Sequence, residues 1–167
     1  GEVDAFFSHS WRDEETAPGK KFEALTAWAA KQGGDPTIWL DKACIVQSNV
    51  DQGLMCLPVF LASCKGMLCV AGESYTKRLW CVVEIHGALI CGICVIFRCI
   101  DVTGVSGGVA SLSDEGAFNM LQNFSIIADL WKCQAAVKAD KDRELTHIGY
   151  ENIDNVNKRG RGSLSAG

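Results

Sequence analysis

The chain has 167 residues, of which 48% are hydrophobic and 22% charged, and its formal net charge is -4. This composition is typical of one soluble globular domain and excludes a disordered or fibrous chain. The acidic balance gives no general reason to bind nucleic acid, which requires clustered lysine and arginine, so we expect no nucleic-acid partner.

Five short apolar runs, rich in β-branched and aromatic residues, predict strands over 3–8, 37–41, 67–72, 92–100 and 123–127. The segments between and after them predict helices over 20–34, 50–64, 79–91, 114–122 and 140–150. Strands that alternate with helices favour a parallel sheet covered on both faces. We therefore expect an α/β fold, a flavodoxin-like three-layer sandwich whose five-stranded parallel sheet has the order 2-1-3-4-5.

Two of the predicted helices carry distinctive local signals. The helix over 20–34 places Phe22, Leu25 and Ala29 on one face and ends in a glycine pair suited to a C-cap. Within 50–64, Pro58 removes a backbone hydrogen bond, so it should kink or restart the helix there.

The run over 79–97 is long enough to cross a bilayer. Glu84 and His86 lie inside it, glycines interrupt it, and its end is rich in β-branched residues. We therefore predict a helix followed by a buried strand, and no membrane segment in this chain.

The sequence predicts a single domain over 1–152 and a flexible basic tail over 153–167. No signal peptide is visible at the N-terminus, and nine cysteines, an odd number, favour reduced thiols, so we expect a cytoplasmic protein. Cys91 and Cys94 have CxxC spacing without a second ligand pair, so we predict no metal site. The glycine-rich stretch 104–111 lacks a Gly-Lys-Ser ending, and we predict a flexible loop there.

In sheets of this order, ligands bind beyond the carboxyl ends of the strands, where the strand order reverses. That point lies between the loops over 8–15 and 72–80. The first loop supplies Ser8, Ser10 and Arg12. The planar guanidinium of Arg12 suits a phosphate, and ordinary turn chemistry with an ion pair to a nearby acid remains an equal alternative.

Helical spacing places Glu84 on the same side of its helix as Trp80, Gly87 and Ala88. The side expected to face the sheet carries Val82, Ile85 and Leu89. This spacing predicts that Glu84 overlooks a shallow surface floored by small residues and walled by the indole. The alternative is a solvated glutamate near the first turn, favoured by the helix dipole.

At this point the sequence resembles a known family. "DAFFSHSWRDE", "IWLDK", "GESYTKRLWCVVEIHGAL" and "GICVIFRCID" are similar to the Toll/interleukin receptor (TIR) domain, over roughly residues 2–102. The Trp-Cys-x-x-Glu match is the most specific part. "WLDKACIVQ" is also similar to a motif of fungal heterokaryon incompatibility domains, which are thought to share a TIR-like fold.

The resemblance implies one of two functions in cell-death or immune-type signalling. Some TIR domains cleave NAD at the nicotinamide-ribose bond, giving ADP-ribose or its cyclic form. In those enzymes the glutamate of the Trp-x-x-x-Glu spacing is catalytic, and here that position is Glu84, with Trp80 lining the pocket. NAD is then a substrate, and no prosthetic group is expected.

The nucleotide side of this expected pocket comprises Ser8, Ser10 and Arg12, together with Asp41 and Lys42. The last two open a segment that in the family gates the pocket and mediates self-association. This chain departs from the family there, since "ACIVQSNV" lacks a common glycine. A non-enzymatic module that signals by homotypic assembly, and a flavodoxin-like small-molecule binding domain, remain alternatives.

Overall fold

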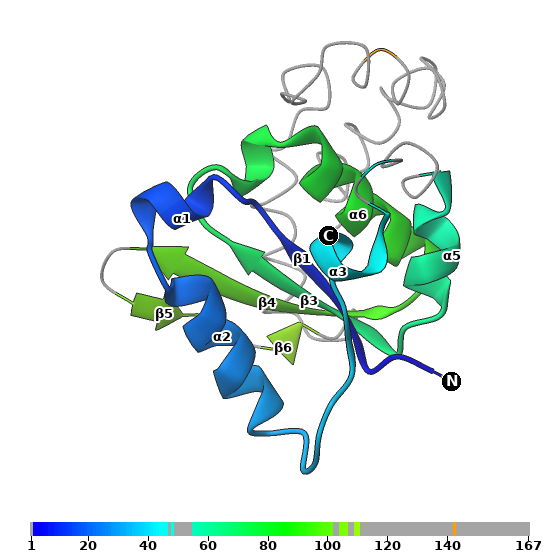
Figure 1. The fold of residues 1–167 in the computed structure, drawn as a ribbon, viewed down its shortest axis with the longest axis horizontal. Helices are drawn as coiled ribbons and strands as arrows, with labels where there is room; N and C mark the ends of the chain where they lie inside the picture. Colours follow the sequence, from blue (N-terminus) through cyan, green and yellow to red (C-terminus); the bar gives the residue numbers. More distant parts are fainter. Residues whose placement is uncertain are drawn as a thin grey trace, which may run out of the picture.

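The computed structural model describes residues 2–46, 48, 55–101, 104–106, 109–110 and 142. The elements in chain order are β1 (Ala5–His9), α1 (Asp13–Thr16), α2 (Lys20–Ala29), β2 (Ile38–Trp39), α3 (Asp41–Cys44), α5 (Leu57–Ala62), β3 (Gly66–Ala71), the 3₁₀ turn η1 (Tyr75–Lys77), α6 (Leu79–Cys91), β4 (Cys94–Asp101), β5 (Gly104–Ser106) and β6 (Val109–Ala110) (Figure 1). The predicted elements over 114–122 and 123–127, nearly all of 140–150 and the tail over 153–167 lie outside the described residues.

The strands form one sheet in the order β2-β1-β3-β4-β5, which confirms the predicted α/β fold and the order 2-1-3-4-5. The fifth position is occupied by residues 104–106, whereas the strand predicted for it, over 123–127, lies outside the described residues. β1 to β4 run parallel, with Phe6 opposite Met67 and Met67 opposite Val95. β5 is antiparallel to β4, and β6 also pairs with β4 in the antiparallel sense. The predicted flexible loop over 104–111 was therefore wrong, because two of its segments pair with β4.

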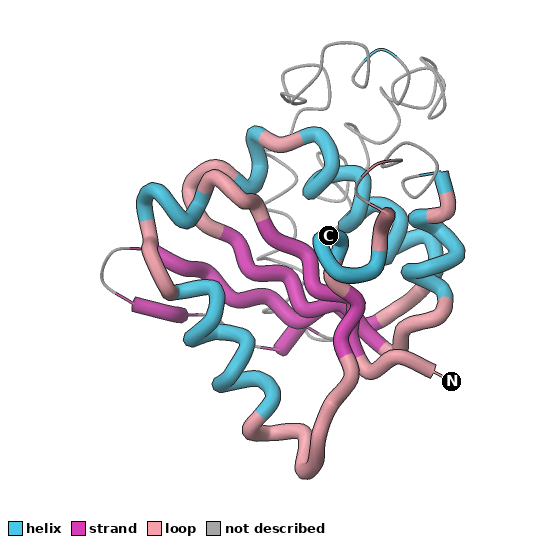
Figure 2. The backbone as a smooth tube through the Cα atoms, in the orientation of Figure 1, coloured by secondary structure: helices cyan, strands magenta, loops and turns pink. Residues whose placement is uncertain are grey.

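Helices cover both faces of the sheet (Figures 1 and 2). Alternate strand residues point to opposite sides, so Phe6, Met67 and Phe97 pack with α5 and α6, whereas Phe7, Leu68 and Ile100 pack with α2. Both sets are apolar, as expected for a parallel sheet buried on two faces. This alternation also decides that Ser8 faces the α6 side and His9 the α2 side.

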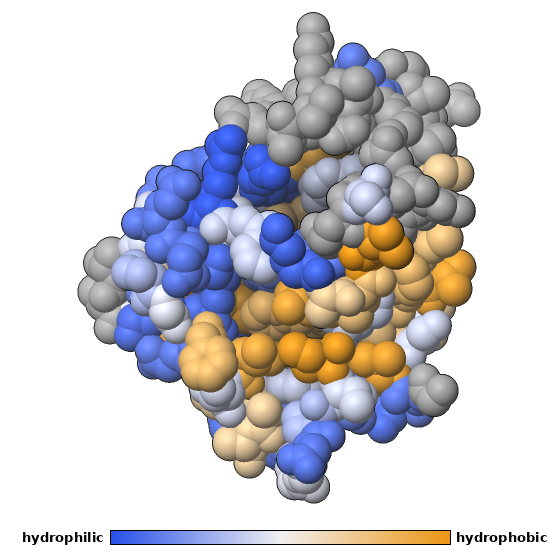
Figure 3. Space-filling view, viewed as in Figure 1, coloured by the Kyte–Doolittle hydropathy of each residue, from blue (hydrophilic) through white to orange (hydrophobic). Residues whose placement is uncertain are grey.

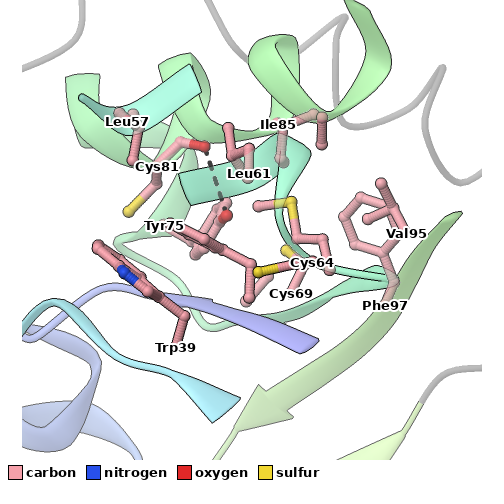
Figure 4. Packing of buried hydrophobic residues seen from close by; sticks show 14 of the residues in the cluster. Trp39, Leu57, Leu61, Cys64, Cys69, Tyr75, Cys81, Ile85, Val95 and Phe97 are labelled. Carbon is pink, nitrogen blue, oxygen red and sulfur yellow. Dashed lines mark hydrogen bonds between the residues drawn. The ribbon is translucent and has the colours of Figure 1, made fainter. Parts of the chain in front are cut away.

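The core on the α6 side is closely packed (Figure 4). Trp39 stacks on Phe6 with ring centroids 4.4 Å apart, and Tyr75 is fully buried. A Cβ added at Gly87 would lie 2.7 Å from Cδ1 of Leu61, so this glycine lets α6 approach α5 closely. These contacts fix the position of α6 over the sheet.

The predicted helices differ from the structure in detail. Phe22 is 71% exposed, since α2 buries Lys21, Ala24 and Trp28 instead. α2 ends at Ala29, before the glycine pair. Pro58 does restart a helix, at the first turn of α5.

The apolar run over 79–97 divides into α6 and the start of β4, as predicted, with Gly92 in the left-handed region at φ 66° between them. Among the described residues, no helix is long and apolar enough to cross a membrane.

Candidate functional site at the carboxyl edge of the sheet

The carboxyl ends of β1 and β3 meet at one edge of the sheet, and a buried carboxylate joins the loops that follow them. Asp13, fully buried at the start of α1, accepts hydrogen bonds from the backbone N–H groups of Gly72 (3.0 Å) and Ser74 (2.8 Å) and from Oγ of Ser74 (2.6 Å). Ser10 donates to Oγ of Ser74 at 2.6 Å. These bonds hold the two loops in one arrangement.

Gly72 is required by this arrangement. A Cβ at position 72 would lie 2.5 Å from Cγ of Asp13, a separation that no real contact adopts. The absence of a side chain therefore allows the loop after β3 to approach the carboxylate.

Glu84 lies in the second turn of α6 and points to the end of β1. Oγ of Ser8 donates to Oε2 of Glu84 at 2.5 Å, and Ser8 is also bonded to the hydroxyl of Tyr75. The Tyr75 hydroxyl lies 3.4 Å from the carbonyl oxygen of Cys81, to which it can donate (Figure 4). Glu84, Ser8, Tyr75 and Cys81 thus form one hydrogen-bonded chain between β1, η1 and α6.

This chain can accommodate Glu84 in either protonation state. With Glu84 ionised, Tyr75 donates to Ser8 and Ser8 donates to the carboxylate. With Glu84 protonated at Oε2, the directions reverse, and Tyr75 donates to the Cys81 carbonyl. No hydroxyl in the chain then loses its partner, which would be costly in a buried site.

Burial of the Glu84 carboxyl group raises its pKa to about 8. The hydrogen bond from Ser8 acts in the opposite direction, and the negative charge of Asp41 adds to the increase. Glu84 as a residue is nevertheless only partly buried. Its carboxyl group is poorly solvated, and this is why its pKa is raised.

The surroundings of Glu84 differ from the sequence prediction. Ala88 is fully buried in the core and Gly87 packs against Leu61, so neither residue floors a surface beside the carboxylate. The alternative of a solvated first-turn glutamate is also wrong, because the first turn of α6 contains no acidic residue. Ile85 lies in the core on the α6 side as predicted, together with Cys81 and Ala88. Val82 is buried but is not part of that core cluster, and the side chain of Leu89 lies outside the described residues.

A second group of side chains surrounds Trp11, in the loop after β1. The indole N–H donates to Oδ2 of Asp41 at 3.1 Å. The Nζ atoms of Lys21 and Lys42 lie 5.3 and 5.5 Å from a Trp11 ring centroid, within cation–π distance. Asp41 thereby connects this cluster with Glu84, on whose carboxyl group its charge acts.

No known protein-family model matches the chain, and no curated protein shows significant sequence similarity to it. The proposed function therefore rests on the geometry of this edge and on the motif resemblance.

The structure brings most of the predicted site residues to this edge. Ser8 and Ser10 are buried, and their hydroxyls bond to Glu84 and Ser74. Arg12 and Lys42 are exposed, and Trp80 is half-buried one turn before Glu84. The nucleotide-binding roles of Ser8, Ser10, Arg12, Trp80, Asp41 and Lys42 stay predictions.

Sequence reasoning did not assign roles to Asp13 and Tyr75. Asp13 stands in an acidic run that reads as a solvated turn, and only its three donors reveal its role. Tyr75 was visible as the aromatic residue of the Ser-Tyr pair before the Trp-Cys-x-x-Glu motif, which was a weak signal.

The described cysteines near Glu84 are poor nucleophiles. Burial raises the pKa of the Cys69 and Cys81 thiols well above the ordinary value, so they remain protonated. Among the described residues, no group of three or more histidine, cysteine or acidic side chains is arranged to hold a metal ion.

Proposed function

We propose that this chain is a TIR-like NAD nucleosidase, which cleaves the nicotinamide-ribose bond with Glu84 as the catalytic carboxylate. The observation that carries the proposal is the position of Glu84. It lies at the carboxyl edge of a parallel sheet where the strand order reverses between β1 and β3, which is where such folds bind ligands. Ser8, which is itself bonded to the hydroxyl of Tyr75, holds its Oε2 in place.

One carboxylate is sufficient for this reaction. The C–N bond breaks with its electron pair passing to the pyridinium nitrogen, so nicotinamide leaves as a neutral molecule and no general acid is needed, unlike in ordinary glycoside hydrolysis. Ionised Glu84 stabilises the positive charge that develops on the ribose. Water then adds to the ribose carbon and loses a proton to the carboxylate or to solvent, giving ADP-ribose.

The raised pKa of Glu84 is compatible with this role. A carboxyl group with a pKa of about 8 is mostly protonated at pH 7 in the unliganded protein. The cationic pyridinium favours the ionised form when it binds nearby, so substrate binding should release a proton. A poorly solvated carboxylate also interacts more strongly with a developing cation than a hydrated one does.

The test is nicotinamide release from NAD by the purified chain, measured over a wide range of protein concentration. Glu84→Gln should abolish turnover, whereas Glu73→Gln, a change at an exposed glutamate paired with Lys77 on the same rim, should retain it. Absence of turnover at every concentration, or equal turnover by Glu84→Gln, would contradict the proposal.

A second candidate function is an interaction module that signals by self-association. The observation that favours it is the exposure of large apolar side chains: Val59 of α5, Met55 just before α5 and Val46 just after α3 are each more than 60% exposed. Figure 3 shows apolar atoms gathered on the side where α5 lies. Such surfaces mark interaction sites in soluble proteins.

Light scattering against protein concentration, with and without NAD, tests this candidate. Self-association that is independent of NAD, combined with no nicotinamide release, would favour the module. A monomer at every concentration would argue against it, and Val59→Asp should weaken any assembly that uses this surface.

A further inference from the structure

Trp11 is unusual among the tryptophans that the structure describes in being 48% exposed while held on several sides. Its N–H group is fixed by Asp41 of α3. Its ring packs against His9 at a centroid distance of 4.2 Å and nearly at a right angle, and His9 in turn packs against Phe7. A buried aromatic stack therefore supports the exposed indole from below.

His9 contributes to this support as a neutral ring. It is 9% exposed, and its two ring nitrogens have no hydrogen-bond partner among the described residues. Burial, with the nearby Lys21 charge, lowers the pKa of His9 to about 4. The imidazole under Trp11 thus carries no charge at neutral pH.

The two lysines at the indole differ in freedom. Lys21 is 7% exposed, and its Nζ is held by the carbonyl oxygens of Ser10 (3.1 Å) and Trp11 (3.4 Å) and by Glu14 (3.3 Å). Lys42 is exposed, and its long flexible side chain can move its ammonium group off the face of the Trp11 ring while the group stays close to the ring edge. Its charge is then available to a phosphate next to a stacked aromatic ring.

We propose that Trp11 is a stacking platform for the purine ring of a nucleotide and that Lys42 lies beside the 5′-phosphates. This inference rests on the proposed function and extends it, because it assigns the adenine end of NAD to Trp11 while the nicotinamide end reaches Glu84. Asp41, bonded to Trp11 and within electrostatic reach of Glu84, connects the two ends.

Calorimetric titration of the full chain with ADP, which has no scissile nicotinamide bond, tests the platform separately from catalysis. Trp11→Ala should weaken ADP binding about 5- to 150-fold, the usual range for loss of a base-aromatic stack, and Trp11→Phe should recover most of the loss. The matched control is Phe22→Ala, which removes an exposed aromatic ring of α2 outside the cluster and should leave the ADP Kd unchanged.

The phosphate contact is tested by comparing ADP with adenosine. Lys42→Gln should weaken binding of ADP but not of adenosine, whereas Lys31→Gln, a change at an exposed lysine after α2, should affect neither. Failure of the wild-type chain to bind ADP, or equal ADP affinity in the Trp11→Ala variant, overturns the inference.

Kinetics provide the second measurement if the chain releases nicotinamide. Trp11→Ala should raise the KM for NAD with little change in kcat. Stacking of the adenine, away from the bond that breaks, stabilises the bound substrate and the transition state by the same amount. Cleavage of nicotinamide mononucleotide, which lacks adenine, should change less than twofold. A parallel loss with both substrates would make Trp11 a structural residue only. ADP binding that depends on Trp11 in a chain that releases no nicotinamide would retain the platform and refute the nucleosidase.

Discussion

Glu84→Gln should make the folded chain more stable at alkaline pH, although it should abolish the proposed activity. Glutamine is close in shape to a protonated glutamate, and its amide oxygen can accept the hydrogen bond from Ser8. The variant therefore removes the ionisation of residue 84 and leaves its packing nearly unchanged.

The magnitude follows from the pKa of Glu84 in the two states. Burial raises it from an ordinary 4.5 to about 8 in the folded chain. Between these values the folded state binds more protons than the unfolded state, so stability falls as pH rises, by about 1.4 kcal/mol per pH unit. The wild-type chain should lose about 3 to 5 kcal/mol from this group between pH 4.5 and pH 8, and lose no more from it above that pH.

Urea denaturation of both proteins from pH 5 to pH 9 measures this difference. The free energies of unfolding should agree within about 1 kcal/mol at pH 5 and diverge by about 3 to 5 kcal/mol at pH 8.5, with Glu84→Gln the more stable. Glu73→Gln, at an exposed and solvated position, should follow the wild type throughout. Parallel curves for Glu84→Gln and wild type would show that the carboxyl group is hydrated and refute the reasoning.

Three further predictions concern the same edge of the sheet. If the chain releases nicotinamide, kcat/KM should rise with pH and level off above about 8, because the free protein must ionise Glu84; a flat profile from pH 6 to pH 9 would contradict this. His9, whose pKa burial lowers to about 4, should remain neutral until acid pH in an NMR titration, and the stability that it contributes should be lost as pH falls from about 6.5 to about 4; a midpoint near 6.5 would place it in water. Gly72→Ala should reduce the free energy of unfolding by about 1 to 3 kcal/mol, because its Cβ would overlap Asp13. Gly104→Ala, where a Cβ meets nothing within 4 Å, is the control, and equal stability of the two variants would exclude the predicted clash.

Local patterns in the sequence were sufficient to predict much of the framework. The helix over 79–91 ends at Cys91 as predicted, because Gly92 supplies the left-handed residue that terminates it. The apolar runs of β1, β3 and β4 alternate with helical segments, and that alternation predicts the parallel pairing that these strands have. The placement of Glu84 at the carboxyl edge of the sheet follows from these two features.

Residues that depend on packing between elements were predicted less well. Helical periodicity grouped Phe22 with Leu25 and Ala29. In the structure, α2 instead buries Lys21, whose ammonium group donates to the carbonyl oxygen of Ser10, just after β1. The segments over 104–106 and 109–110 read as a flexible loop because glycine is common there. Pairing with an open edge of β4 overrides that local signal.

The sequence by itself determined that a carboxylate, Glu84, lies on a helix at the carboxyl edge of an α/β sheet. Only the tertiary structure decided that this carboxylate turns inward to Ser8, that Tyr75 completes its hydrogen-bonded chain, and that Asp13 connects the two loops. It also decided that Trp11 meets lysines from α2 and α3. The physical reason is that local periodicity fixes the direction of a side chain relative to its own helix or strand. The partner that it meets, and therefore its solvation and pKa, depends on contacts between residues far apart in the chain.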